Sequence, residues 1–139
     1  MFEKAIALDP QYAGAYAVLG WARLQEWLAQ WNQEPQTPVQ VFALAQQAVV
    51  LDDSLPLAHT TLGVAYLWQR QYEQAIAEGE RAITLDPNYA EGYAWLGAIV
   101  NLAGRPAEAI VAVEKALRLN PHDPFFYLST HLTRSLAGG

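Results

Sequence analysis

Cysteine is missing from this sequence of 139 residues, and basic residues are scarce. The lack of cysteine excludes disulfide bonds and zinc sites with cysteine ligands, and it is compatible with a reducing compartment. Eight Lys and Arg stand against fourteen Asp and Glu, so the formal net charge is −6. Because nucleic-acid-binding domains usually carry a basic excess or a basic stripe, we expect no nucleic-acid partner.

Long apolar runs are also missing. No run reaches the roughly 18 residues that a membrane-spanning helix needs, and the longest candidate, residues 13–31, is interrupted by Arg23 and Glu26. The first residues, MFEKAIALDP, have neither the basic start nor the long apolar core of a signal peptide. We therefore expect no membrane insertion and a cytoplasmic location.

Patterns that carry catalysis or bind metals are absent as well. His59, His122 and His131 have no partner three or four residues along the chain that would complete a metal pair on a helix. No serine lies in a G-x-S-x-G turn, and the glycines are dispersed rather than gathered in a phosphate-binding loop. We expect no enzyme, with no catalytic, cofactor-binding or metal-binding residue.

The sequence is rich in apolar residues, which make up 53% of it, and it contains a spacing that recurs. The phrase LDPN at residues 85–88 returns as LNPH at residues 119–122, an offset of 34 (119 − 85). Repeats of this length are typical of arrays in which each unit packs on its neighbours. The same offset relates Leu62 to Leu96, Gly63 to Gly97, Ala75 to Ala109 and Ala82 to Ala116.

An earlier copy of the repeat contains additional residues. Gly20 and Gly63 are 43 residues apart (63 − 20), which is nine more than the repeat length. The surplus lies between Gly20 and Ala48, and the segment WLAQWNQEPQTP at residues 27–38 is the place for a loop because it holds two prolines and an asparagine.

Each copy has the pattern of two helices. Tyr93, Leu96, Gly97 and Val100 share one helical face, and the sequence around Gly104 then ends that helix. The pattern predicts eight helices, at residues 2–8, 12–31, 38–51, 56–69, 72–85, 90–103, 106–119 and 124–136. It divides the chain into a half repeat (1–12), a repeat with the nine-residue insertion (13–55), two repeats (56–89 and 90–123) and a half repeat (124–139).

This pattern resembles the tetratricopeptide repeat family over the whole chain. The resemblance implies an all-α, right-handed superhelical solenoid of antiparallel helix pairs whose function is to bind other proteins. His59, Gly79, Val100 and Asp53 depart from the motif at single positions. At the motif positions, the copy that begins at Pro56 has His59, Leu62, Gly63, Tyr66, Ala75, Gly79, Ala82 and Pro87.

The resemblance further implies a concave groove along the first helices of the repeats, largely apolar and able to hold a peptide or partner protein. Trp21 and Trp68 are the foremost candidates for ligand contact. Trp27 and Trp31 are expected to pack under the extra loop. Trp95, two residues after Tyr93, is expected to face away from the main packing stripe, where it could touch the next repeat. The implied groove residues are Ala17, Trp21, Leu24, Thr60, Val64, Leu67, Trp68, Ala94, Ala98, Asn101, Leu128 and Leu132.

Two alternative functions remain open at this point. The predicted helices 2–8 and 124–136 carry apolar side chains where a polar capping helix is usual, so the chain could self-associate into a homo-oligomer through its ends. Segments such as YLWQRQYEQAIAEGERAI and RLNPHDP also resemble the repeat region of some bacterial adenylate or guanylate cyclases. That resemblance implies a regulatory segment of a larger enzyme, because the 139 residues contain no cyclase catalytic segment.

Overall fold

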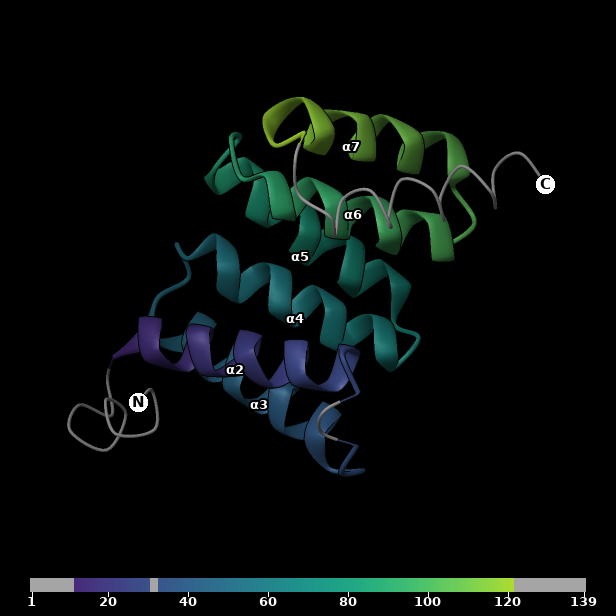
Figure 1. Ribbon diagram of the computed structural model, residues 1–139. Helices are drawn as coiled ribbons and strands as arrows, with labels where there is room; N and C mark the ends of the chain where they lie inside the picture. Colours follow the sequence, from purple (N-terminus) through teal and green to yellow (C-terminus); the bar gives the residue numbers. More distant parts are fainter. Residues whose placement is uncertain (1–11, 31–32, 122–139) are drawn as a thin grey trace.

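The computed structural model describes residues 12–30 and 33–121, and these fold into α-helices joined by short loops (Figure 1). Every helix predicted within these ranges is present, with ends that agree to within three residues, so the all-α prediction is confirmed here. The predicted helices 2–8 and 124–136 lie outside the described residues. The helices are α2 (Ala13–Leu28), α3 (Thr37–Leu51), α4 (Pro56–Trp68), α5 (Tyr72–Leu85), α6 (Ala90–Leu102) and α7 (Pro106–Leu119).

The helices stack in chain order, from α2 and α3 at one end to α7 at the other (Figure 1). Each helix packs on the next one along the chain, and α4 also lies against both α2 and α6. The first helices of the three pairs therefore form one continuous layer. Among the described residues, no helix combines the length and apolarity that crossing a bilayer requires.

The 34-residue period reappears in the loops. The backbone N–H of Ser54 donates to Asp52 Oδ1 at 3.0 Å, and the N–H of Asn88 donates to Asp86 Oδ1 at the same distance. The loops inside the helix pairs repeat as well. Gly104, between α6 and α7, has φ +88°, and Arg70, at the same position between α4 and α5, has φ +58°. Glycine adopts this left-handed conformation freely, whereas an arginine side chain makes it unfavourable.

Glycines permit the closest helix contacts. A Cβ on Gly97 would lie 2.6 Å from Val113 Cγ2 and 3.2 Å from the carbonyl oxygen of Ala109. A Cβ on Gly63, one repeat earlier, would lie 3.2 Å from the carbonyl oxygen of Ala75. A side chain at Gly97 would force its neighbours to move, and one at Gly63 would make an unusually tight contact, so the repeated glycine position allows the close helix approach that the sequence predicts.

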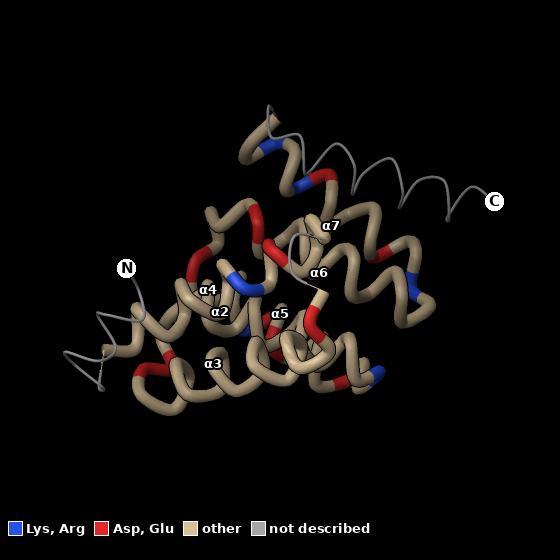
Figure 2. Tube along the Cα trace, turned by 60° about the horizontal axis from the view of Figure 1, so that its bottom comes forward, with Lys and Arg blue, Asp and Glu red and all other residues tan. Residues whose placement is uncertain are grey.

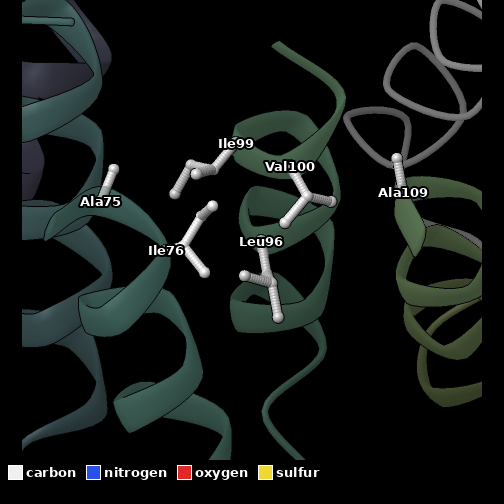
Figure 3. Close-up of a cluster of buried hydrophobic side chains, with 6 residues drawn as sticks. All are labelled: Ala75, Ile76, Leu96, Ile99, Val100 and Ala109. Carbon is white, nitrogen blue, oxygen red and sulfur yellow. The ribbon is translucent and has the colours of Figure 1, made fainter. Parts of the chain in front are cut away.

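A buried apolar cluster joins α5, α6 and α7 (Figure 3). Ile76 of α5 points toward α6, and Leu96 and Ile99 of α6 point back toward it. The full cluster is Ala75, Ile76, Leu96, Ile99, Val100 and Ala109. Burial of this apolar surface favours the packing of these neighbouring helices.

His59 makes a polar bridge inside the α4–α5 pair. Its Nδ1 lies 2.5 Å from Glu78 Oε2, and its Nε2 lies 2.7 Å from the backbone oxygen of Asp53. A carboxylate and a carbonyl only accept hydrogen bonds, so the protonated ring, in which both nitrogens donate, is the form that satisfies both contacts. Burial opposes this charge, but the hydrogen bonds to Glu78 and Asp53 outweigh burial and raise the pKa of His59.

Candidate functional site

The layer formed by α2, α4 and α6 carries most of the tryptophans. Trp21 of α2 meets Trp95 of α6 edge to face, with 6.3 Å between ring centroids and an interplanar angle of 87°. The two rings reach across the central helix α4 and pack in one cluster with its residue Val64. This pair links helices that are not neighbours in the stack.

A second tryptophan pair lies at the C-terminal ends of α2 and α4. Trp27 and Trp68 have ring centroids 6.3 Å apart at an angle of 60°. Behind them, Phe42 of α3 meets Tyr66 of α4 edge to face at 5.3 Å. Edge-to-face pairs of this kind add about 0.5–1.5 kcal/mol beyond the burial of the rings. The aromatic side chains are therefore held in fixed positions by one another.

Five predicted groove residues converge on one cluster. Trp21, Leu24, Val64, Trp68 and Ala98 all pack with Val41, Ala65, Phe42 and Trp95. Leu24 and Val64 are buried at its centre, whereas Trp21, Trp68 and Ala98 are partly exposed. We call the partly exposed side chains of this cluster, Trp21, Trp68 and Ala98, together with Trp27, the tryptophan surface. Asn101 is included because it is partly exposed and follows Ala98 by one turn of α6.

Several predicted groove residues are buried, each at most 2% exposed: Ala17, Leu24, Thr60, Val64 and Ala94. Side chains so deeply covered pack between helices and support the surface instead of presenting atoms to a ligand. Leu67 is partly buried and packs against the α5–α6–α7 cluster, away from Trp21 and Trp68. Leu128 and Leu132 lie outside the described residues.

Trp95 lies on the side of α6 opposite Tyr93, as predicted, and it touches another repeat, although that repeat is the first described pair and not the next one along the chain. It is 7% exposed and forms half of the Trp21–Trp95 contact. The spacing argument considers one helix pair at a time, whereas this contact joins α2 to α6 across α4. The only sequence signal is the size of the residue, since the equivalent positions in the other copies hold Val18 and Thr61.

An open cavity of about 590 Å³ adjoins the tryptophan surface at the C-terminal end of α2. Trp27, Leu28, Gln30 and Gln33 line it. Trp27 therefore contacts Trp68 and also lines the cavity, which extends the surface into the inserted segment. Trp31, the other tryptophan of that segment, lies outside the described residues.

The chemistry of the tryptophan surface is apolar and amide-like. Its side chains are indoles, methyl groups and the Asn101 amide, which bind apolar groups and hydrogen-bonding groups but are neither acids nor nucleophiles. Within residues 12–30 and 33–121, no group of three or more His, Asp or Glu is placed to hold a metal ion. Such a surface fits binding better than catalysis.

Parts of this chain are similar to a repeat family and to known proteins. The tetratricopeptide repeat family model matches residues 56–89. A stretch of 76 residues, or 54% of this chain, is 40% identical to "Putative adenylate cyclase 3" of Rhizobium meliloti (strain 1021). A stretch of 74 residues, or 53% of this chain, is 32% identical to "Hsp70-Hsp90 organizing protein" of Triticum aestivum. Each of these matches covers 13% of the relative's own length.

Known structures share the fold over nearly the whole chain. The crystal structure of MamA is 26% identical, with a TM-score of 0.71, and the match covers 99% of this chain and 75% of that one. The crystal structure of a thermophilic TPR protein of Thermus thermophilus has a TM-score of 0.75 at 21% identity. That match covers 95% of this chain and 69% of the Thermus protein.

Proposed function

Because the chain carries tetratricopeptide repeats, we propose that it is a non-catalytic scaffold whose tryptophan surface binds a peptide segment of a partner protein. The observation that carries this proposal is the arrangement of Trp21 and Trp68. Each is partly exposed, and each rests against a second tryptophan on another helix. Proteins with such repeats act in protein–protein interaction, and tryptophans dominate the binding energy of many interfaces.

The fixed positions of the rings favour binding. Free side chains lose about 0.5–1.5 kcal/mol each when an interface immobilises them. Trp21 and Trp68 are already constrained by Trp95 and Trp27, so this loss is smaller on the scaffold side. The ligand that matches the surface is an apolar peptide, either an amphipathic helix or an extended segment.

The surface does not suit a ligand that is recognised mainly by its terminal carboxylate. Repeat proteins that grip such a carboxylate would need basic or amide side chains at the positions of Ala17, Thr60 and Ala94, which are buried here. On the tryptophan surface, Asn101 offers a peptide backbone an amide donor and acceptor beside the indole N–H groups, and no charged side chain belongs to it. We therefore propose that side-chain burial, rather than charge, sets the affinity.

Selection from a displayed peptide library tests this function. The bait is the full 139-residue chain, and enriched peptides are re-tested against Trp68→Ala. The matched control is Val50→Ala, because Val50 is 74% exposed on α3, away from the tryptophan surface. We expect enriched peptides that keep binding to the control and lose it with Trp68→Ala, while circular dichroism shows unchanged helicity. Equal binding to both variants would refute the site.

A second function, as a regulatory segment of a cyclase-like enzyme, is favoured by one observation. The relative with 40% identity is named as a cyclase, although the match covers only 13% of it. If the chain is part of such a protein, the surrounding gene encodes a cyclase domain, and deleting these repeats changes regulation of the cyclase without abolishing its activity. A gene that encodes no such domain contradicts this proposal.

Self-association through the chain ends is a further proposal that rests on the sequence of segments 2–8 and 124–136. Light scattering coupled to size exclusion, over a wide concentration range, tests it. A mass that rises above 15.4 kDa with concentration supports self-association, and a constant mass of 15.4 kDa contradicts it.

A further inference from the structure

A second hollow lies on the other side of α6. A cavity of about 370 Å³ opens between α5 and α7 and is floored by Tyr93 and Leu96 of α6. Tyr93 precedes Trp95 by two residues, which is about 200° around a helix, so the cavity and the Trp21–Trp95 pair face opposite sides of α6. Its walls are Ile83 of α5 and Val111, Ala112 and Lys115 of α7.

The 34-residue register explains why this place is hollow. Ala112 occupies the position that Glu78 occupies one repeat earlier (78 + 34 = 112), and Tyr93 corresponds to His59 (59 + 34 = 93). In the earlier repeat the Glu78 side chain extends to His59 and joins it at 2.5 Å. In the later repeat the methyl group of Ala112 ends far short of that reach. The small Ala112 side chain therefore leaves space on the α5–α7 side that Glu78 fills one repeat earlier.

The rim of the cavity is apolar and basic. Val111 is 65% exposed beside it, although an isolated valine on a surface is unremarkable. Lys115 Nζ lies 6.0 Å from the centre of the Tyr93 ring, and Arg118 follows one helical turn later at the same rim. Figure 2 shows these basic positions (blue) along the part of α7 that leads to its C-terminal end.

The lining of the cavity has more basic than acidic groups. Its one carboxylate, Glu108, has Oε2 4.0 Å from Nη1 of Arg105, whose Nη2 lies 3.7 Å from Oε1 of Glu73 of α5. These exposed pairs are weak. Among the described residues, no carboxylate pairs with Lys115 or Arg118. In a chain with a net charge of −6, these two basic groups give one end of the cavity a local charge that favours a carboxylate.

We propose that the α5–α7 cavity is a second docking site, for an acidic amphipathic segment of a partner protein. One apolar side chain of that segment enters between Ile83, Leu96 and Val111. A neighbouring Asp or Glu of the segment meets Lys115 and Arg118. The volume, near the lower end for ligand pockets, matches a small anchor rather than a large ligand. This site does not depend on the tryptophan surface.

A small probe with the same chemistry tests the proposal. The probe is 3-phenylpropanoate, an aromatic group with a carboxylate, and the control is the neutral 3-phenylpropanamide. Two-dimensional ¹H–¹⁵N NMR of the full chain follows the amides during titration. We expect the shifts to centre on Val111, Ala112 and Lys115 with the carboxylate, and the neutral amide to bind about two- to fivefold more weakly.

Two variants locate the binding. Ala112→Glu places in the cavity the residue found one repeat earlier, and we expect it to weaken binding at least about tenfold because it adds bulk and negative charge. Lys115→Gln, which leaves the apolar walls unchanged, should weaken binding of the carboxylate to the level of the amide. Trp68→Ala should have no effect, which separates this site from the tryptophan surface.

Other results would overturn the proposal. Shifts that persist unchanged in Ala112→Glu, or that centre on α2 and α4, place the probe elsewhere. Equal affinity for the carboxylate and the amide would show that Lys115 and Arg118 do not bind the carboxylate. Concentration-dependent shifts of the α7 amides without probe identify a second copy as the occupant. Nuclear Overhauser contacts between Ala112 and residues 122–139 identify the chain's own end as the occupant.

Discussion

Trp21 and Trp95 contact each other edge to face although they belong to the first and third helix pairs of the stack. In most repeat arrays each unit touches only its neighbours, so stability is close to a sum of unit and nearest-neighbour terms. Here one contact reaches across the middle unit. This contact therefore links the stability of the first described pair to that of the third, in addition to the contacts between neighbouring pairs.

The coupling can be measured with a double-mutant cycle. Trp21→Phe, Trp95→Phe and the double variant are unfolded in urea. We expect an interaction free energy of about 0.5–1.5 kcal/mol, the range for edge-to-face aromatic pairs. Effects of the two changes that simply add would show that the rings meet without stabilising each other.

Gly97 gives a test of the closest helix contact. Gly97→Ala would force a Cβ to 2.6 Å from Val113 Cγ2, so we expect a loss of about 1–3 kcal/mol despite the better helix propensity of alanine. Gly14→Ala is the matched control, because its Cβ would meet only the exposed, movable Tyr12 ring at 3.0 Å. The control should be neutral or slightly stabilising, and equal losses in both variants would contradict the packing account.

Arg70 offers a stabilising change. It holds φ +58° at the position where the next repeat has Gly104, so Arg70→Gly should relieve the unfavourable conformation and stabilise the fold by up to about 1 kcal/mol. The neighbouring Gln69→Gly is the control, because Gln69 has φ −87° and gains nothing from glycine. Thermal or urea unfolding measures the stability of both variants relative to the wild type. A loss of stability in Arg70→Gly would mean that contacts of the Arg70 side chain stabilise the fold by more than its backbone conformation destabilises it.

The His59 bridge predicts a dependence of stability on pH. The folded-state pKa of His59 is raised, so its contribution is fully present below the unfolded value of about 6.5 and is lost as pH rises through the folded value. The facing charges are Glu78, which favours the protonated ring, and Arg81, which opposes it. Burial also opposes it.

Comparison with His59→Tyr isolates this effect, since the other two repeats have Tyr16 and Tyr93 at that position. Urea unfolding between about pH 5.5 and about pH 8.5 should show the wild type losing stability relative to the variant as pH rises. A difference between the two proteins that stays constant with pH, or that grows in favour of the wild type, would contradict a protonated His59.

The helices could be predicted because the information lies within each repeat. Small residues such as Gly63 and Gly97, and the recurring turns after Leu51 and Leu85, fix helix ends and helix contacts locally. The register also carried structural details, since the Asp52–Ser54 hydrogen bond recurs at Asp86–Asn88. Periodicity of this kind leaves few alternatives for the fold.

The site was harder to predict because it depends on contacts between repeats. Family positions selected Trp21, and Trp68 was chosen as the neighbour of the family position Leu67; both lie on one cluster. The same family positions also selected Thr60 and Ala94, which the structure buries. The spacing placed Trp95 opposite Tyr93 but could not name Trp21 as its partner, because that residue lies two helix pairs away. No sequence motif pointed to the α5–α7 cavity, whose lining residues come from three helices and include the small Ala112.

The most direct test of the account is the affinity of one selected peptide for matched variants, measured by isothermal titration calorimetry. We expect Trp68→Ala to weaken binding by a factor of about 30 or more, as for an interface hot spot of about 2 kcal/mol. Ala112→Glu and Val50→Ala should leave the affinity unchanged. If the peptide binds Trp68→Ala as tightly as the wild type, the tryptophan surface is not the binding site and the central proposal is wrong.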